Sequence, residues 1–279
     1  RFAALSHTTP VGVNGDTVLF SASYLRTEPA TTALVGRAGS FGVQYTRPVI
    51  RSFDRDFFIT LGIDGLNSDN ALFGRQFSDD RTRAVRLAAA YSRTKPKAVS
   101  YIVGSVSRGV DGLGARTTAP AFTDLEFTKF NVRAGYNLAL GEKTALRLKA
   151  AGQASDDVLP GSEQFALGGP EYGRAYESSI VSGDTGYAGS AELAYRPSAL
   201  PQNLAGSEVY TFVDGGRVQY KARSVFAGAD YRLGSIGAGV RVNVKNAIIE
   251  VEGAKGLSSD TAFLDNRDWR GVVSLPTLF

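Results

Sequence analysis

The chain has 279 residues, of which 43% are hydrophobic and 21% charged, and its formal net charge is +4. This length accommodates one large all-β domain or two medium-sized ones. The sequence contains no Cys, which excludes disulfides, Cys-ligated metal clusters and thiol catalysis, and its one histidine, His7, is too few for a histidine metal site. The charges are mixed in sign along the chain, so they indicate no nucleic-acid partner.

Apolar and polar residues alternate with a period of two along most of the chain. In 130–138, for example, Phe130, Val132 and Leu138 share one face, and Asn131 and Arg133 lie on the other. Successive side chains of a strand point to opposite faces, so each such segment has an apolar and a polar face. The pattern predicts strands near 1–5, 17–26, 40–48, 57–67, 81–93, 98–108, 126–140, 143–155, 185–196, 207–218, 235–244, 247–255 and 269–279.

Strand length and link length both point to a membrane barrel. Most of the predicted strands have about 10–13 residues, longer than usual globular strands and close to the roughly 9–11 that cross a bilayer. Short links, such as 95–97, 141–143 and 245–246, alternate with long ones after 57–67 and at 109–125, 156–184 and 256–268. Short turns at one end and long loops at the other are typical of outer-membrane barrels. We therefore predict an all-β transmembrane antiparallel barrel with 12 to 13 strands visible and with His7 in a turn.

The polar faces would line the barrel interior. The residues predicted to point inward carry both charges, which argues against a strongly ion-selective porin; they are Asp64, Arg86, Arg133, Arg147, Lys149, Glu192, Arg196, Arg241, Glu250 and Glu252. Three inward glycines, Gly135, Gly237 and Gly239, either leave room for a loop or relieve crowding between strands. The segment 98–108 fits either register, so its faces stay unassigned.

Several motifs occur in a fixed order in the second half of the chain. They are Phe165-Ala166-Leu167-Gly168-Gly169, Gly173-Arg174-Ala175-Tyr176, Gly183-Asp184-Thr185-Gly186 with Glu192-Leu193 after it, and Phe212-Val213-Asp214-Gly215-Gly216. This order resembles the two-partner secretion transporters, the TpsB or haemolysin secretion/activation family. The final Phe279 is similar to the C-terminal signal of outer-membrane barrels. Ala175 stands where the family pattern has Gly, and a positive φ at this position would be strained.

The resemblance implies a location and a domain organisation. The protein would lie in the outer membrane of a Gram-negative bacterium, with 1–279 as the barrel portion of a longer protein whose N-terminal strands and periplasmic domains precede it. The complete barrel would have 14 or 16 strands, and 156–184 would fold into its lumen. The motif residues of this loop and the wall would be Arg174, Tyr176, Asp214, Phe212, Gly216, Gly183, Asp184 and Glu192, with Arg174 paired to Asp214.

The resemblance also implies an activity. The protein would export a partner exoprotein through its barrel without nucleotide, with the outer-membrane lipid and its own periplasmic domains as further partners. The alternatives are a passive pore or channel and a barrel-assembly-type membrane insertase. An outer-membrane enzyme or adhesin has less support, because one histidine provides no nucleophile–base constellation. We therefore expect no catalytic residue, no cofactor and no metal.

Overall fold

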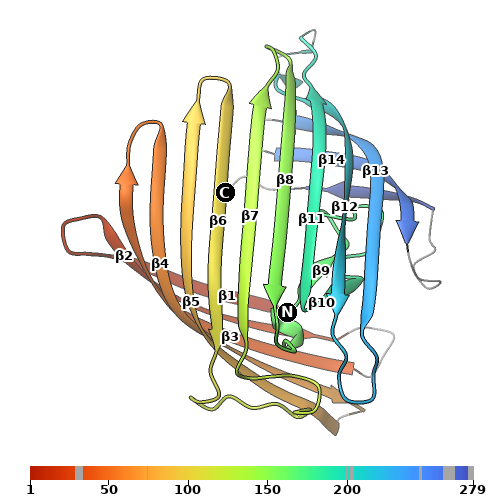
Figure 1. The fold of residues 1–279 in the computed structure, drawn as a ribbon. Helices are drawn as coiled ribbons and strands as arrows, with labels where there is room; N and C mark the ends of the chain where they lie inside the picture. The colour runs from red at the N-terminus through yellow and green to blue at the C-terminus, as the bar shows by residue number, and fades with distance from the viewer. Residues whose placement is uncertain are drawn as a thin grey trace.

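One large antiparallel sheet accounts for nearly the whole protein (Figure 1). The computed structural model describes residues 1–28, 34–73, 75–198, 200–201, 204–244, 247–259 and 268–275. Thirteen strands form the sheet in the order β1-β2-β3-β4-β5-β6-β7-β8-β11-β12-β13-β14-β15. Their bounds are β1 (Phe2–Val11), β2 (Asp16–Thr27), β3 (Leu34–Arg51), β4 (Arg55–Leu72), β5 (Arg75–Lys95), β6 (Ala98–Gly109), β7 (Thr128–Ala139), β8 (Thr144–Ser155), β11 (Thr185–Tyr195), β12 (Glu208–Tyr220), β13 (Ala229–Val244), β14 (Ala247–Ser259) and β15 (Trp269–Ser274).

The remaining elements lie between β8 and β11. They are the short 3₁₀ helix η1 (Gly161–Glu163) and the two-stranded hairpin of β9 (Phe165–Leu167) and β10 (Val181–Gly183). Figure 1 shows this hairpin inside the curve of the large sheet. No helix in the part of the chain that the structure describes is both long enough and apolar enough to cross a membrane.

Each predicted strand has a counterpart in the sheet, but several strands are longer than predicted. β4 and β5 have 18 and 21 residues and stay paired up to Leu72 and Arg75. The long loop expected after 57–67 is therefore wrong, because only residues 73 and 74 separate the two strands. The added residues are mostly polar, as in Ser78-Asp79-Asp80, so they carry no alternation although their backbone continues the ladder.

A second difference concerns the first strand. His7 was expected in a turn, but it lies within β1, directly opposite Phe20 of β2. The polar run around His7 looks like a turn, yet its backbone groups are paired, and the turn begins only after Val11. Gly12 and Gly15, with φ of 67° and 82°, make this turn. The predicted turn at 245–246 and the terminal Phe279 lie outside the described residues.

The two faces of the sheet differ as the alternation predicts. Along β12, Val209 and Val213 are 45% and 47% exposed. Phe212 and Asp214, the two neighbours of Val213 in the chain, are only 3% and 5% exposed. Register-matched neighbours extend the apolar face across five strands as a continuous row: Tyr136, Leu148, Ala191, Val213 and Ile236. We call this face the outer face, and the face that carries Asp64, Arg86, Glu192, Asp214 and Glu252 the inner face.

Strand pairing also assigns the faces of β6. Gly104 lies opposite the outer residue Val132, and Tyr101 lies opposite the inner residue Gly135. Side chains directly opposite each other share a face, so Tyr101, Val103 and Ser105 point inward. Both faces of this strand mix apolar and small polar residues, which is why the sequence pattern alone left its register open.

Inner-face glycines lie beneath aromatic rings of the neighbouring strand. A Cβ added to Gly135 would come within 2.2 Å of the Tyr101 ring, and one added to Gly237 within 2.5 Å of the Phe212 ring. Both pairs are direct cross-strand partners, as are Tyr210 and Gly239. Gly135, Gly237 and Gly239 thus make room for aromatic rings of the neighbouring strand, and such pairs help to fix strand register.

The outer face yields a first prediction. Val132→Arg and Leu148→Arg should each destabilise the folded protein by roughly 2–4 kcal/mol, because they place a cation in the hydrocarbon of the bilayer. Both side chains lie on the outer face, 44% and 38% exposed. Equilibrium unfolding in lipid vesicles measures the difference.

The matched control is Asn131→Arg, one residue from Val132. Asn131 points to the inner face and borders a cavity of about 510 Å³ that it shares with Arg133, so the longer side chain has polar surroundings. Its cost should be well below that of Val132→Arg. Equal costs for the two variants would show that the assigned faces are wrong.

Candidate functional site

The 156–184 segment makes a folded projection on the inner face of the sheet. Leu167 of β9 pairs with Val181 of β10, and residues 168–180, which we call the tip, connect the two strands. Gly168 and Gly169 open the tip with φ of 101° and 96°, a backbone conformation that L residues rarely adopt. Hydrogen bonds within the tip, such as Gly168 N to Tyr172 O at 2.9 Å, give it a defined shape.

Two motif glycines let the hairpin lie close to the wall. A Cβ on Gly216 of β12 would lie 2.9 Å from the Leu167 side chain of β9. A Cβ on Gly183 of β10 would lie 2.6 Å from the carbonyl oxygen of Gln219 on β12. The backbone of the next residue continues this contact, since Asp184 N donates to Gln219 O at 2.9 Å.

The tip brings Arg174 to the wall motif of β12. Arg174 Nε lies 3.4 Å from Asp214 Oδ2, and the two side chains are 7% and 0% exposed. The backbone N–H of Gly173 donates to Asp214 Oδ1 at 2.7 Å, and Ser235 Oγ of β13 donates to the same oxygen. The Asp214 carboxylate therefore holds both the backbone and the side chain of the tip.

Arg174 has further partners on the inner face. Its Nη1 lies 3.2 Å from Glu192 of β11 and 3.0 Å from Glu252 of β14. Its guanidinium carbon lies 4.1 Å from the centre of the Phe212 ring, the distance of a cation–π contact. Three carboxylates and one ring thus surround a single buried guanidinium, and a planar group with five donors can serve several acceptors at once.

Tyr176 and Ala175 complete the tip. Tyr176 is 5% exposed and belongs to the same buried apolar cluster as Phe212, and Arg270 of β15 donates to its backbone oxygen. The positive φ in this motif, 81°, belongs to Gly173. Ala175 is not among the described residues with positive φ, so the replacement of the family's Gly by Ala at this position causes no strain.

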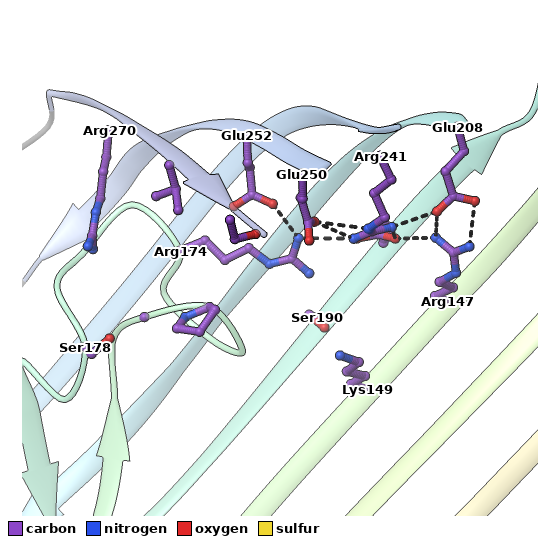
Figure 2. A pocket seen from close by; sticks show the side chains of 15 residues that line it. Arg147, Lys149, Arg174, Ser178, Ser190, Glu208, Arg241, Glu250, Glu252 and Arg270 are labelled. Carbon is purple, nitrogen blue, oxygen red and sulfur yellow. Dashed lines mark hydrogen bonds and ion pairs between the residues drawn. The ribbon is translucent and has the colours of Figure 1, made fainter. Parts of the chain in front are cut away.

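A row of paired charges continues from Arg174 along the inner face (Figure 2). Arg147 and Arg241 both contact Glu192 at 2.7 Å and both contact Glu208. Arg241 also pairs with Glu250, and the Tyr210 hydroxyl joins Glu250 to Glu252, the partner of Arg174. This row borders a cavity of about 590 Å³, and Lys149 also lines this cavity.

The structure separates Asp184 from this group. Asp184 is fully buried and pairs with Arg223 at 2.6 Å, and its carboxylate also accepts the backbone N–H groups of Leu159 and Lys221 at 2.8 Å. Arg223 in turn donates to Phe122 O at 2.9 Å. This pair therefore joins the long links 110–127, 156–184 and 221–228 at one end of the sheet.

Sequence reasoning missed several residues of the site. Glu208 shares a face with Tyr210, Phe212 and Asp214, so strand alternation could have found it. Ser235, Arg223 and Glu163 lie where no pattern singles them out, and only the fold brings them to their partners. No group of three or more potential metal-binding side chains occurs in the described ranges.

The Asp184–Arg223 pair gives a second prediction. Arg223→Ala should leave a buried carboxylate without its cation, a change that typically costs about 3–5 kcal/mol, and should loosen the three long links. Limited proteolysis of intact cells should then cleave within 110–127 or 221–228 faster than in the parent protein. Arg232→Ala, at an exposed arginine of β13, serves as the control and should leave cleavage unchanged. Unaltered cleavage in Arg223→Ala would show that the pair does not hold these links.

Comparison with known proteins agrees with this architecture. Residues 6–242 match the family model of the haemolysin secretion/activation protein ShlB/FhaC/HecB. The outer membrane transporter CdiB of Dickeya dadantii (strain 3937) is 28% identical over 166 residues, which cover 58% of this chain and 30% of that protein.

Solved structures show the same fold at low sequence identity. CdiB from Escherichia coli superposes with a TM-score of 0.83 at 17% identity, covering 98% of this chain and 52% of that one. CdiB from Acinetobacter baumannii gives 0.77 at 16% identity, covering 98% and 49%. BamA from Haemophilus ducreyi gives 0.68 at 11% identity, covering 98% and 62%. The chain thus spans about half the length of the CdiB structures and under a third of the curated relative.

These findings confirm three predictions made from the sequence: the all-β antiparallel barrel fold, the location in the outer membrane and the protein family. The motif order in 165–216 that suggested the family lies within the matched region. The chain belongs to the haemolysin secretion/activation protein family ShlB/FhaC/HecB.

Proposed function

We propose that this chain forms the barrel through which a partner exoprotein is exported across the outer membrane without nucleotide. The 156–184 segment occupies the lumen, and Arg174, held by Asp214, Glu192 and Glu252, is the contact that keeps it there. This contact is the observation that carries the proposal. A passive pore has no need for a buried ionic attachment between a loop and its own wall.

The lining of the inner face supports a polypeptide as the substrate. Five cations and four carboxylates border the cavity beside Arg174, and most of them are paired with one another. Such a surface offers no ring of one sign, which ion selectivity would require. An exported polypeptide of mixed composition would meet both positively and negatively charged side chains on this surface.

The segment must leave its position before an extended chain can pass. Breaking a buried ion pair costs about 3–5 kcal/mol, which is enough to convert a mostly docked tip into a mostly undocked one. We therefore place the Arg174 contacts at the control point of export. The relative named outer membrane transporter CdiB is consistent with an export role. The likeness to BamA concerns the fold and leaves membrane insertion as the alternative.

The third prediction tests this contact. Arg174→Ala and Asp214→Asn should each reduce export of the partner exoprotein, while the folded barrel stays in the membrane. Arg174→Ala should be the more severe variant, because Arg174 also pairs with Glu192 and Glu252. The double variant should match Arg174→Ala, since the shared interaction is already absent. Immunoblots of medium and outer membranes, with heat-dependent gel mobility as the folding check, measure both quantities.

Arg196→Ala is the matched control on the same face. Arg196 is 55% exposed and pairs with Glu208 at 3.3 Å. A solvent-exposed ion pair of this kind contributes little to stability. Export by this variant should equal that of the parent protein. Normal export by Arg174→Ala with a folded barrel would exclude the proposed control point. Normal export accompanied by loss of other outer-membrane barrels would favour membrane insertion as the activity.

The fourth prediction distinguishes a gated conduit from a passive pore. In planar lipid bilayers, Arg174→Ala should raise the open probability of the channel above that of the parent protein, because the undocked tip vacates the lumen. Arg196→Ala again provides the comparison. If the parent protein and Arg174→Ala conduct equally, the tip does not limit passage and a passive pore fits better.

A further inference from the structure

A second ionic attachment lies at the other end of the 156–184 segment. Glu163, in η1, contacts Arg86 of β5 at 2.7 Å and Lys129 of β7 at 2.8 Å, and its side chain is only 8% exposed. Arg86 also forms a bidentate pair with Asp64 of β4. Burial by itself raises the pKa of the Glu163 carboxyl, but Arg86 and Lys129 outweigh burial and hold this pKa below its usual range.

The two attachments lie on different parts of the wall. In the sheet order, β5 and β7 lie on one side of β8, and β11, β12 and β14 lie on the other. Glu163 thus fastens the start of the segment to β5 and β7, and Arg174 fastens the tip to β11, β12 and β14. We call them the base anchor (Glu163 with Arg86 and Lys129) and the tip anchor (Arg174 with Asp214, Glu192 and Glu252).

The base anchor combines three kinds of contact. Besides the carboxylate pairs, the backbone oxygen of Glu163 accepts from Lys129 Nζ at 2.8 Å and from Gln153 Nε2 at 3.0 Å. Leu159, four residues earlier, packs with Phe127 and Ala84 in a fully buried cluster. Side chain, backbone and apolar packing therefore hold the base at the same place.

The tip anchor is built differently. Arg174 Nε and Asp214 Oδ2 are 3.4 Å apart, and neither atom forms a hydrogen bond. The cavity of about 590 Å³ borders Arg174 together with Gly169 and Ser178 of the tip. The remaining tip contacts are those of Arg174 Nη1 with Glu192 and Glu252 and of Gly173 N–H with Asp214. The adjacent cavity gives the tip room to move while the base contacts stay in place.

We propose that Glu163 is a positioning residue for export: it holds the base of the segment on β5 and β7 while the tip leaves β12, so that the segment pivots and is not expelled. This role rests on the export function proposed above. Movement would be confined to residues 168–180, beyond the positive-φ glycines Gly168 and Gly169. The anchored base would then return the tip to its wall site after each passage.

The test measures the two anchors separately with spin labels. The chain has no Cys, so pairs of introduced cysteines are the only labelling sites. Ser162 and Ser68 border one cavity of about 300 Å³ and report on the base. Ser178 and Ser190 border the cavity of about 590 Å³ and report on the tip. Electron paramagnetic resonance gives the distance distribution of each pair in reconstituted protein.

Glu163→Gln keeps the shape of the side chain and removes its charge, and Lys129→Met removes the wall cation together with its bond to the Glu163 backbone. Both variants should broaden the base distances and leave the tip distances sharp. Arg174→Ala should do the opposite. Glu171→Gln is the matched control in the same segment, because Glu171 is 53% exposed and lies 3.6 Å from the exposed Arg133; it should change neither distribution.

Export in the same variants separates the proposal from the function on which it rests. Glu163→Gln and Lys129→Met should lower export severalfold with the barrel folded, as judged by heat-dependent mobility. Unchanged base distances in both variants, or broadening of both pairs in each, would overturn the base anchor. If Arg174→Ala lowers export and the two base variants do not, the export function stands and the role of Glu163 is wrong. If the distances respond as expected and no variant changes export, the export function itself fails.

Discussion

The lipid surroundings of the strands govern the rest of this structure. Hydrocarbon offers no hydrogen-bond partner, so every spanning backbone group must be paired within the sheet. The antiparallel ladder pairs the strands from β2 to β14 on both sides, and it leaves apolar side chains such as Val213 outside. In the part of the strands that crosses the bilayer, charged side chains are then favoured on the inner face, where they must find partners in a crowded space. The charge row from Arg147 to Arg174 and the cluster around Glu163 are two outcomes of this one constraint.

The fold was largely predictable because this constraint repeats along the sequence. Each crossing strand needs one apolar face, and a period of two records that need residue by residue. The period of two disappears where a strand extends beyond the hydrocarbon of the bilayer, because no apolar face is needed there. Ser78-Asp79-Asp80 extends β5 with polar residues, and the run around His7 continues β1, so both were misread as links. Backbone pairing persists at these places, but nothing in the side chains reports it.

The site was predictable in part, for a different reason. Arg174, Asp214, Phe212 and Tyr176 came from an ordered set of motifs, and the structure brings these four together. Glu192 lies with them, whereas Asp184 lies with Arg223 at the loop end. Residues that meet across many strands, such as Glu163 and Arg86, are 77 positions apart and carry no local signature. The contact between Glu163 and Arg86 depends on how the sheet curves, and the pattern of residues along the sequence does not record that curvature.

The aromatic–glycine pairs of the inner face have a consequence for sequence change. Phe212 occupies the volume in which Gly237 would carry a side chain, and Tyr210 does the same over Gly239. Neither partner can be replaced alone without a clash or a void, so substitution at one position requires a compensating one on the adjacent strand. Joint variation at such positions in an alignment of relatives would therefore report strand register directly, even in strands whose hydrophobic alternation is too weak to read.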